Sequence, residues 1–276
     1  MQKKESPVWP WVLGVVVVVG AGGAWVLKDR LPGQADGPPA AVSTNAGSPV
    51  APAAGPAAET TPPTEPTVQH PIDTALTADP ALPSLADSDA PVWEALAAQL
   101  ADSRVLDLLL RDHLLQRWVT HIDNLDKPSL APVAMAVKPL PGTLQVEATD
   151  GVEQIAAGNA TRYAPYVAAF AALDAEAVGK TYVRFYPLIQ QVYAELGRKD
   201  AYFNDRLVAV IDHLLATPEP TRPLPVERDA RGRYRFVDVA LQERSVGQKL
   251  LLRMDAAQAQ AVKKQLRAIR RAITRG

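Results

Sequence analysis

The sequence predicts a mainly α, irregular helical domain with one or two small β-hairpins, preceded by one transmembrane helix and a disordered Pro/Ala-rich linker. Three observations support this prediction. Residues 8–27 are uncharged and mostly apolar, ten of the 25 Pro fall in residues 31–71, and apolar residues recur at helical spacing after residue 85. We therefore divide the chain into a short cytoplasmic tail (1–7), a transmembrane helix (8–27), a tether (28–84) and a helical domain (85–276).

Residues 8–27 are long enough to cross a membrane, because about 20 helical residues cover the roughly 30 Å hydrocarbon core. Trp residues lie at both ends of this run, as membrane interfaces favour. A cleaved signal peptide is the alternative, with small residues at 21–23 as its cleavage site. Since the apolar run continues beyond that point, we expect an uncleaved anchor in the lipid bilayer.

The orientation of the anchor follows from the basic residues that flank it. After Arg30 the next basic residue is Arg104, and the 73 residues between them contain nine acids. Such a stretch offers little to retain it in the cytoplasm. We expect a single-pass protein of the bacterial inner membrane, with a cytoplasmic N-terminus and a periplasmic C-terminal domain. The inverted topology stays open as an alternative.

The tether is rich in Pro, Ala, Gly and Thr. Residues 31–71 contain only three acids and almost no large apolar side chain, so they cannot bury enough surface to offset the entropy of an ordered chain. We expect a semi-extended spacer that holds the domain away from the membrane.

Apolar stripes predict two helices in the first part of the domain. Pro91 lies near the start of the first, which contains Val92, Leu96 and Leu100. The second stripe is longer and ends at Lys127-Pro128; it consists of Leu108, Leu115, Trp118, Ile122 and Leu125. Alternating residues around Asp150-Gly151 then predict a small hairpin in residues 138–156.

Three more helices are expected at residues 159–173, 174–196 and 200–217, where most of the aromatic residues lie. Pro187 predicts a kink or a break near Tyr186 in the middle one. A strand at residues 233–237 and a short buried segment at 250–252 follow. Asp255, with Gln258 three residues later, predicts the start of a final helix.

The sequence contains no recognisable set of catalytic residues. The absence of Cys excludes thiol nucleophiles, disulfides and cysteine-ligated metals, and no hydrolase, zinc-protease or phosphate-loop motif occurs. The four histidines, His70, His113, His121 and His213, have no spacing that would bind one metal ion. We therefore predict no catalytic residue, no metal and no cofactor, and we favour a non-enzymatic binding or scaffold module.

An envelope hydrolase that uses paired carboxylates is the competing interpretation. Three carboxylates are candidates for its acid and its base: Asp123, Asp205 and Asp212. It requires two of these carboxyl groups to face each other across a cleft.

A polar and aromatic cluster at the start of the helix at 200–217 is the candidate binding site. Tyr and Arg are frequent anchors of interfaces, so this cluster can form a recognition surface. The alternative is structural, because an acid suits a helix N-terminus and an Arg can pair with a neighbouring carboxylate. The predicted binding residues are Tyr163, Tyr166, Tyr186, Asn204, Asp205 and Arg206.

The C-terminal part of the chain is strongly basic. Residues 222–276 contain 14 basic and five acidic residues, although the whole chain has a net charge of −1. The last helix is either a solvated face, or it attracts a polyanion such as a lipid headgroup or an acidic wall polymer. The expected partners are an envelope protein or an anionic envelope polymer, and not nucleic acid. The helix contains Lys263, Lys264, Arg267, Arg270, Arg271 and Arg275.

Several segments resemble one bacterial family in the same order. They are DAP at 89–91, VTHIDNL at 119–125, RYAPYV at 162–167, YPLIQQ at 186–191, ELG at 195–197, FNDRL at 203–207, IDHLL at 211–215 and GQKLLLRM at 247–254. The family is the domain of unknown function 3014, and the resemblance covers about residues 85–273. It implies a single N-terminal anchor, a Pro/Ala-rich spacer and a mainly helical domain in Gram-negative bacteria. It implies no activity and no catalytic residues.

Overall fold

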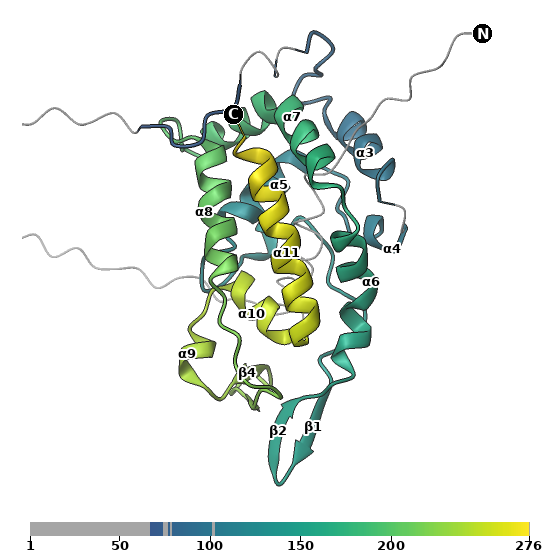
Figure 1. Cartoon of the computed structure of the whole chain (residues 1–276), viewed down its shortest axis with the longest axis vertical. Helices are drawn as coiled ribbons and strands as arrows, with labels where there is room; N and C mark the ends of the chain where they lie inside the picture. The colour runs from purple at the N-terminus through teal and green to yellow at the C-terminus, as the bar shows by residue number, and fades with distance from the viewer. Residues whose placement is uncertain (1–66, 74–76, 78, 101–102, 276) are drawn as a thin grey trace, which may run out of the picture.

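The computed structural model describes residues 67–73, 77, 79–100 and 103–275, which form a mainly helical domain with two small antiparallel hairpins (Figure 1). This confirms the predicted mainly α class. The predicted transmembrane helix at residues 8–27 and the tether up to residue 66 lie outside the described residues. In the part of the chain that is described, no helix is both long and apolar enough to cross a membrane.

The C-terminal helix α11 (Ala256–Ile273) occupies the centre of the domain in Figure 1, between α8 (Phe203–Leu215) and α6 (Asn159–Ala171). It also packs against the longest helix, α7 (Ala175–Glu195). Asp255 begins α11 as predicted, since its carboxylate accepts a hydrogen bond from the backbone N–H of Gln258 at 2.6 Å.

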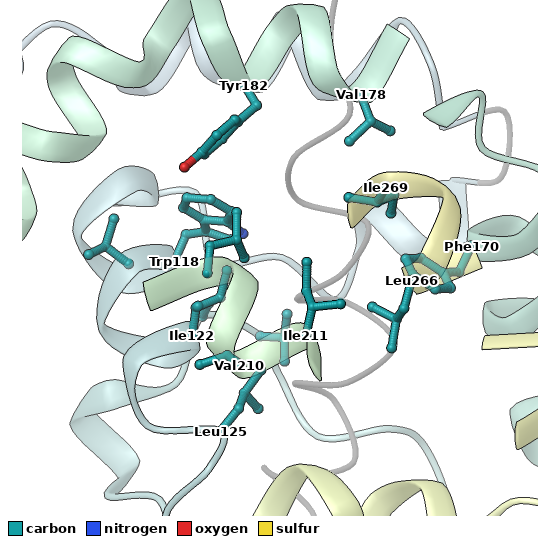
Figure 2. Close-up of a cluster of buried hydrophobic side chains, with 14 of the residues drawn as sticks. Trp118, Ile122, Leu125, Phe170, Val178, Tyr182, Val210, Ile211, Leu266 and Ile269 are labelled. Carbon is teal, nitrogen blue, oxygen red and sulfur yellow. The ribbon is translucent and has the colours of Figure 1, made fainter. Parts of the chain in front are cut away.

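Aromatic and aliphatic side chains from α5, α7, α8 and α11 fill the main core (Figure 2). The ring of Trp118 lies 6.3 Å from that of Tyr182 and 5.6 Å from that of Phe203, measured between centroids. Edge-on and tilted pairs of this kind add to the burial of apolar area. These contacts join three helices that are distant in the sequence.

The first two helices differ from prediction in length. The first expected helix is α3 (Asp89–Ala97), which ends before Leu100, and α4 (Ser103–Leu106) is a single turn. The next helix, α5 (Leu114–Asp123), does not reach back to Leu108. Instead, the carboxylate of Asp89 accepts hydrogen bonds from the backbone N–H groups of His113 and Leu114, each at 2.8 Å, and so caps α5 from another helix.

A short 3-10 helix η1 (Pro132–Ala134) and a hairpin follow α5. The hairpin consists of β1 (Val146–Thr149) and β2 (Val152–Ile155), joined at Asp150 and Gly151 as predicted. Both turn residues have positive φ, 52° and 78°, which is the backbone that a tight hairpin turn requires.

The helices α7 and α8 depart from prediction at particular residues. Although Pro187 lies inside α7, the helix is not broken there. Helix α8 begins at Phe203 rather than at Asp200, because Gln190 of α7 determines where it starts. The side-chain oxygen of Gln190 accepts a hydrogen bond from the backbone N–H of Phe203 at 2.8 Å.

The second hairpin, β3 (Val226–Arg228) and β4 (Tyr234–Phe236), lies beside the first, and its strand matches the expected one. A short helix α9 (Val239–Gln242) leads to α10 (Val246–Arg253). The expected short buried segment at 250–252 is thus the end of a helix. An apolar run of three residues does not by itself distinguish a strand from a buried helical turn.

Candidate functional site

Asp205, one of the predicted binding residues, holds the chain that precedes the helical bundle. Its carboxylate accepts hydrogen bonds from the backbone N–H groups of Gln69 and His70 at 3.0 and 2.7 Å. The ring Nδ1 of His70 lies 3.0 Å from the same carboxylate. Asp205 therefore binds Gln69 and His70, which are close to it in space but distant in the sequence.

Two residues just before Asp205, Asn204 and Tyr202, complete this contact. The side-chain amide of Asn204 donates to the carbonyl oxygens of His70, at 2.9 Å, and of Ile273, at 3.1 Å. The hydroxyl of Tyr202 accepts from the backbone N–H of Ile72 at 2.7 Å, and the side chain of Ile72 is buried. We call residues 69–72 the docked segment. It is fixed between the start of α8 and the end of α11.

Arg206 points to another partner. Its guanidinium donates to the carboxylate of Asp123 at 2.6 Å and to both carboxylate oxygens of Asp126 at 2.8 and 2.9 Å. Burial alone would raise the pKa of Asp126, but the hydrogen bonds and charge of Arg206 outweigh it and lower that pKa. Arg206 thus joins α8 to the end of α5 through a largely buried ion network.

The three predicted tyrosines are buried and lie on two different helices. Tyr186, on α7, accepts a hydrogen bond from the backbone N–H of Asn204 at 3.3 Å and donates to Gln190 at 3.0 Å. Tyr163 and Tyr166 belong to α6, which lies on the opposite side of α11 from α8 (Figure 1). The structure therefore brings Tyr186 together with Asn204, and it separates the other two tyrosines from them.

Each carboxylate proposed for a hydrolase has its own partner. Asp123 binds Arg206, Asp205 binds the docked segment, and Asp212 binds Arg270 with two hydrogen bonds of 2.7 and 2.8 Å. Asp205 and Asp212 lie about 10 Å apart along α8, because seven residues each add 1.5 Å of rise. These contacts do not form the pair of facing carboxyl groups that a hydrolase of this kind requires at the substrate bond.

The histidines are likewise separate. His121 is buried in α5, where its Nδ1 accepts a hydrogen bond from the backbone N–H of Ala136 at 3.2 Å. Burial penalises the imidazolium and lowers the pKa of His121 to about 4, although the carbonyl of Ala134 opposes the shift. His213 lies 2.9 Å from the hydroxyl of Ser245. Over the described ranges, no three His, Asp or Glu side chains are grouped to hold a metal ion.

The exposed face of α11 is basic. Three cations of this region have partners, since the buried Lys263 binds Glu219, Arg270 binds Asp212, and Arg275, just after α11, binds Glu176. Three further cations, Lys264, Arg267 and Arg271, are exposed and form no ion pair with any carboxylate that the structure describes. We call these three the α11 stripe.

The α11 stripe lies on one side of the helix, because its members are three and four residues apart. The neighbouring helix α6 adds no acid, since its exposed residues are all Thr or Ala: Thr161, Ala164, Ala168 and Ala171. Glu219 is a nearby acid; its hydrogen bond with Lys263 lowers its pKa, and the charge of Arg267 acts in the same direction. The stripe is therefore a positive surface that faces solvent.

Sequence reasoning missed His70 and Tyr202. His70 falls within the predicted tether (28–84), and Tyr202 is not among the predicted binding residues. Since the segment at 67–73 is mostly polar, no apolar period indicated that it would pack. One signal was present, because Ile72 is an isolated large apolar residue at the end of a Pro-rich stretch.

A family model described as protein of unknown function (DUF3014) matches residues 114–270. The match covers the chain from the start of α5 to near the end of α11. It therefore includes Asn204, Asp205, Arg206 and two members of the α11 stripe, Lys264 and Arg267, and it ends one residue before Arg271. No curated protein and no solved structure matches the chain.

Proposed function

Because the chain belongs to the DUF3014 family, which brings no described activity with it, we propose a function from the site itself. The protein is a non-enzymatic, membrane-anchored scaffold of the bacterial envelope, and its α11 stripe binds an anionic envelope polymer. Residues 8–27 hold it in the inner membrane, and the helical domain works in the periplasm.

The α11 stripe is the observation that supports this proposal. Lys264, Arg267 and Arg271 keep their charges exposed on one helix, while nearby cations are neutralised by acids. Long cationic side chains that form no ion pair attract polyanions over a distance of roughly 8 Å at physiological salt. A stripe of positive charge along a helix suits an extended polymer better than a compact ligand.

The other predicted residues support binding rather than catalysis. Catalytic carboxylates need to reach a substrate, and their environments push their pKa values apart. Here Asp123 and Asp126 share Arg206, and Asp205 holds the docked segment. These contacts stabilise the domain, and the α11 stripe is left as the functional surface.

The docked segment also fits a tethered scaffold. It meets the domain beside Ile273 at the C-terminal end of α11, and the stripe extends from Arg271 back to Lys264. A flexible tether of about 40 residues has a root-mean-square reach of roughly 35 Å. A domain held in this way reaches a polymer layer above the membrane.

Sedimentation of the full chain with isolated cell-wall sacculi tests the proposal. The chain is reconstituted in nanodiscs, and the fraction that pellets with sacculi is measured for wild type and for a triple variant of the stripe, Lys264→Glu, Arg267→Glu and Arg271→Glu. We expect the apparent affinity of the variant to fall by about tenfold or more, because three attractions become repulsions.

A matched control reverses three exposed cations away from α11: Lys138→Glu, Lys199→Glu and Arg231→Glu. It changes the net charge by the same amount and should retain most of the binding. Equal losses in both variants would indicate a non-specific charge effect and would contradict a site on α11. Binding that neither variant weakens would contradict it as well.

A reporter fused after Gly276 tests the proposed location. An enzyme that is active only in the periplasm, fused to the full chain, should be active in cells. The same fusion made with a reporter that is active only in the cytoplasm should be silent. The reverse pattern would establish the inverted topology.

A further inference from the structure

The two hairpins lie beside the beginnings of α6 and α11 at one end of the domain (Figure 1). Residues of these elements line a pocket there. The pocket has a volume of about 320 Å³, which is within the range of small-molecule sites. Its wall is mostly apolar and includes Ile155, Leu224 and Met254, all buried.

Two arginines line this apolar pocket. Arg253, the last residue of α10, is only 6% exposed, and its guanidinium carbon lies 6.0 Å from the centroid of the Phe236 ring. Arg222 is half-buried, and one of its N–H groups donates to the carbonyl oxygen of Leu252 at 2.6 Å. A guanidinium has five N–H donors, so Arg222 retains donors for a ligand.

The acids that share the pocket have other partners. Asp255 caps α11 through the N–H of Gln258, and Glu147 lies on the exposed strand β1, where it accepts a hydrogen bond from Gln154 at 3.4 Å. Arg222 makes no ion pair with any carboxylate in the described ranges. Burial lowers the pKa of Arg222, and the charges of Asp255, which lines the same pocket, and of Glu219 oppose that shift.

We propose that this pocket binds a small anion in which a carboxylate is attached to a short aliphatic group. Arg222 and Arg253 meet the carboxylate, because a guanidinium matches its two oxygens with parallel hydrogen bonds. Leu224, Ile155 and Met254 receive the aliphatic part. A free short-chain fatty acid and the C-terminal residue of a peptide both carry this chemistry.

Saturation-transfer NMR with the full chain in nanodiscs tests the site, with empty nanodiscs as the blank. The probes are hexanoate and acetyl-Ala-Leu, each compared with its uncharged amide. We expect at least one of the two acids to bind with a dissociation constant near or below about 10 mM, and about tenfold more tightly than its amide. Tighter binding of hexanoate would indicate a free fatty acid as the ligand, and tighter binding of acetyl-Ala-Leu would indicate the C-terminus of a peptide.

Two variants locate the binding. Arg222→Gln keeps a hydrogen-bonding side chain without charge and should weaken the binding of the acid by about tenfold. Ala157→Phe places a ring at an exposed position of the pocket lining and should block both acids. Arg231→Gln, an exposed change in the nearby turn outside the lining, should leave binding unchanged.

The proposal is overturned if neither acid binds at about 10 mM, if amides bind as well as acids, or if Arg222→Gln and Ala157→Phe both leave binding intact. The site is separate from the α11 stripe. The triple variant of the stripe should therefore bind the acids like wild type, and a failure at one site leaves the result at the other unaffected.

Discussion

His70 and Asp205 approach each other to 3.0 Å between the ring Nδ1 and a carboxylate oxygen, across 135 residues of sequence. The same carboxylate also accepts from the backbone N–H of His70 at 2.7 Å. This pair fixes the point at which the chain from the N-terminal side reaches the domain. It therefore places the entry of the chain beside the C-terminal end of α11.

The docked segment should loosen when Asp205 is changed. Asp205→Ala removes the acceptor for the N–H groups of Gln69 and His70, so we expect these amides to exchange hydrogen about tenfold faster or more. Hydrogen-exchange mass spectrometry of the full chain measures this locally. Asp212→Ala is the control on the same helix, because it removes only an exposed pair with Arg270. Unchanged exchange at residues 69–72 in Asp205→Ala would show that the contact does not hold the segment.

The Arg206 network should be the most costly ion pair to break. Arg206→Ala leaves the buried Asp123 and the partly buried Asp126 with only longer ion pairs, to Arg198 at 3.6 Å and to Lys127 at 3.4 Å, and we expect the free energy of unfolding to fall by about 3 kcal/mol. Arg270→Ala breaks an exposed pair and should cost less than about 1 kcal/mol. Urea unfolding of both variants measures the difference. Equal costs would contradict a structural role for the network.

Acid should destabilise the domain through His121. Its pKa in the folded state is about 4, below the ordinary value of 6.5, so folding favours the neutral ring. The resulting stability is present above pH 6.5 and is lost as pH falls from 6.5 towards 4, by up to about 3 kcal/mol.

Urea unfolding at a series of pH values, for wild type and His121→Asn, isolates this contribution. Asn keeps an acceptor near the position of Nδ1 for the N–H of Ala136, and it cannot be protonated in this range. We expect the variant to be less stable at neutral pH because Asn is smaller than His, so the slopes of stability against pH are compared rather than the absolute values. Parallel slopes for the two proteins would contradict the assignment to His121.

Gly179 should be required where α7 meets α11. A Cβ at this position would lie 3.0 Å from the Cβ of Ala272 and 3.2 Å from its carbonyl oxygen. Gly179→Ala should therefore destabilise the domain by about 1 kcal/mol, although Ala is normally better than Gly inside a helix. Ala272→Gly in the same chain should recover part of this loss. Thermal unfolding of the single and double variants measures the coupling, and a stabilising Gly179→Ala would contradict the close approach.

The regular features of the fold could be predicted from the sequence. Asp255 and Gln258 indicated the start of α11. The turn at Asp150-Gly151 indicated the first hairpin. These features depend on residues close together in the sequence, where period and capping chemistry are visible.

The features that depend on distant residues could not be predicted. The start of α5 is set by Asp89, and the start of α8 by Gln190. The partner of Asp205 lies more than 130 residues away. The sequence identified Asn204, Asp205 and Arg206 as a notable cluster, but the binding of Asp205 to the docked segment requires the three-dimensional arrangement.

The salt dependence of sacculus binding tests the central claim most directly. Binding of the full chain in nanodiscs is measured from low to high ionic strength for wild type and for the triple variant of Lys264, Arg267 and Arg271. We expect wild-type affinity to fall by about tenfold or more as the Debye length shrinks from roughly 30 Å to 3 Å, and the variant to bind weakly throughout. Wild-type binding that does not change with salt, or a variant that follows the wild-type curve, would contradict an electrostatic site on α11.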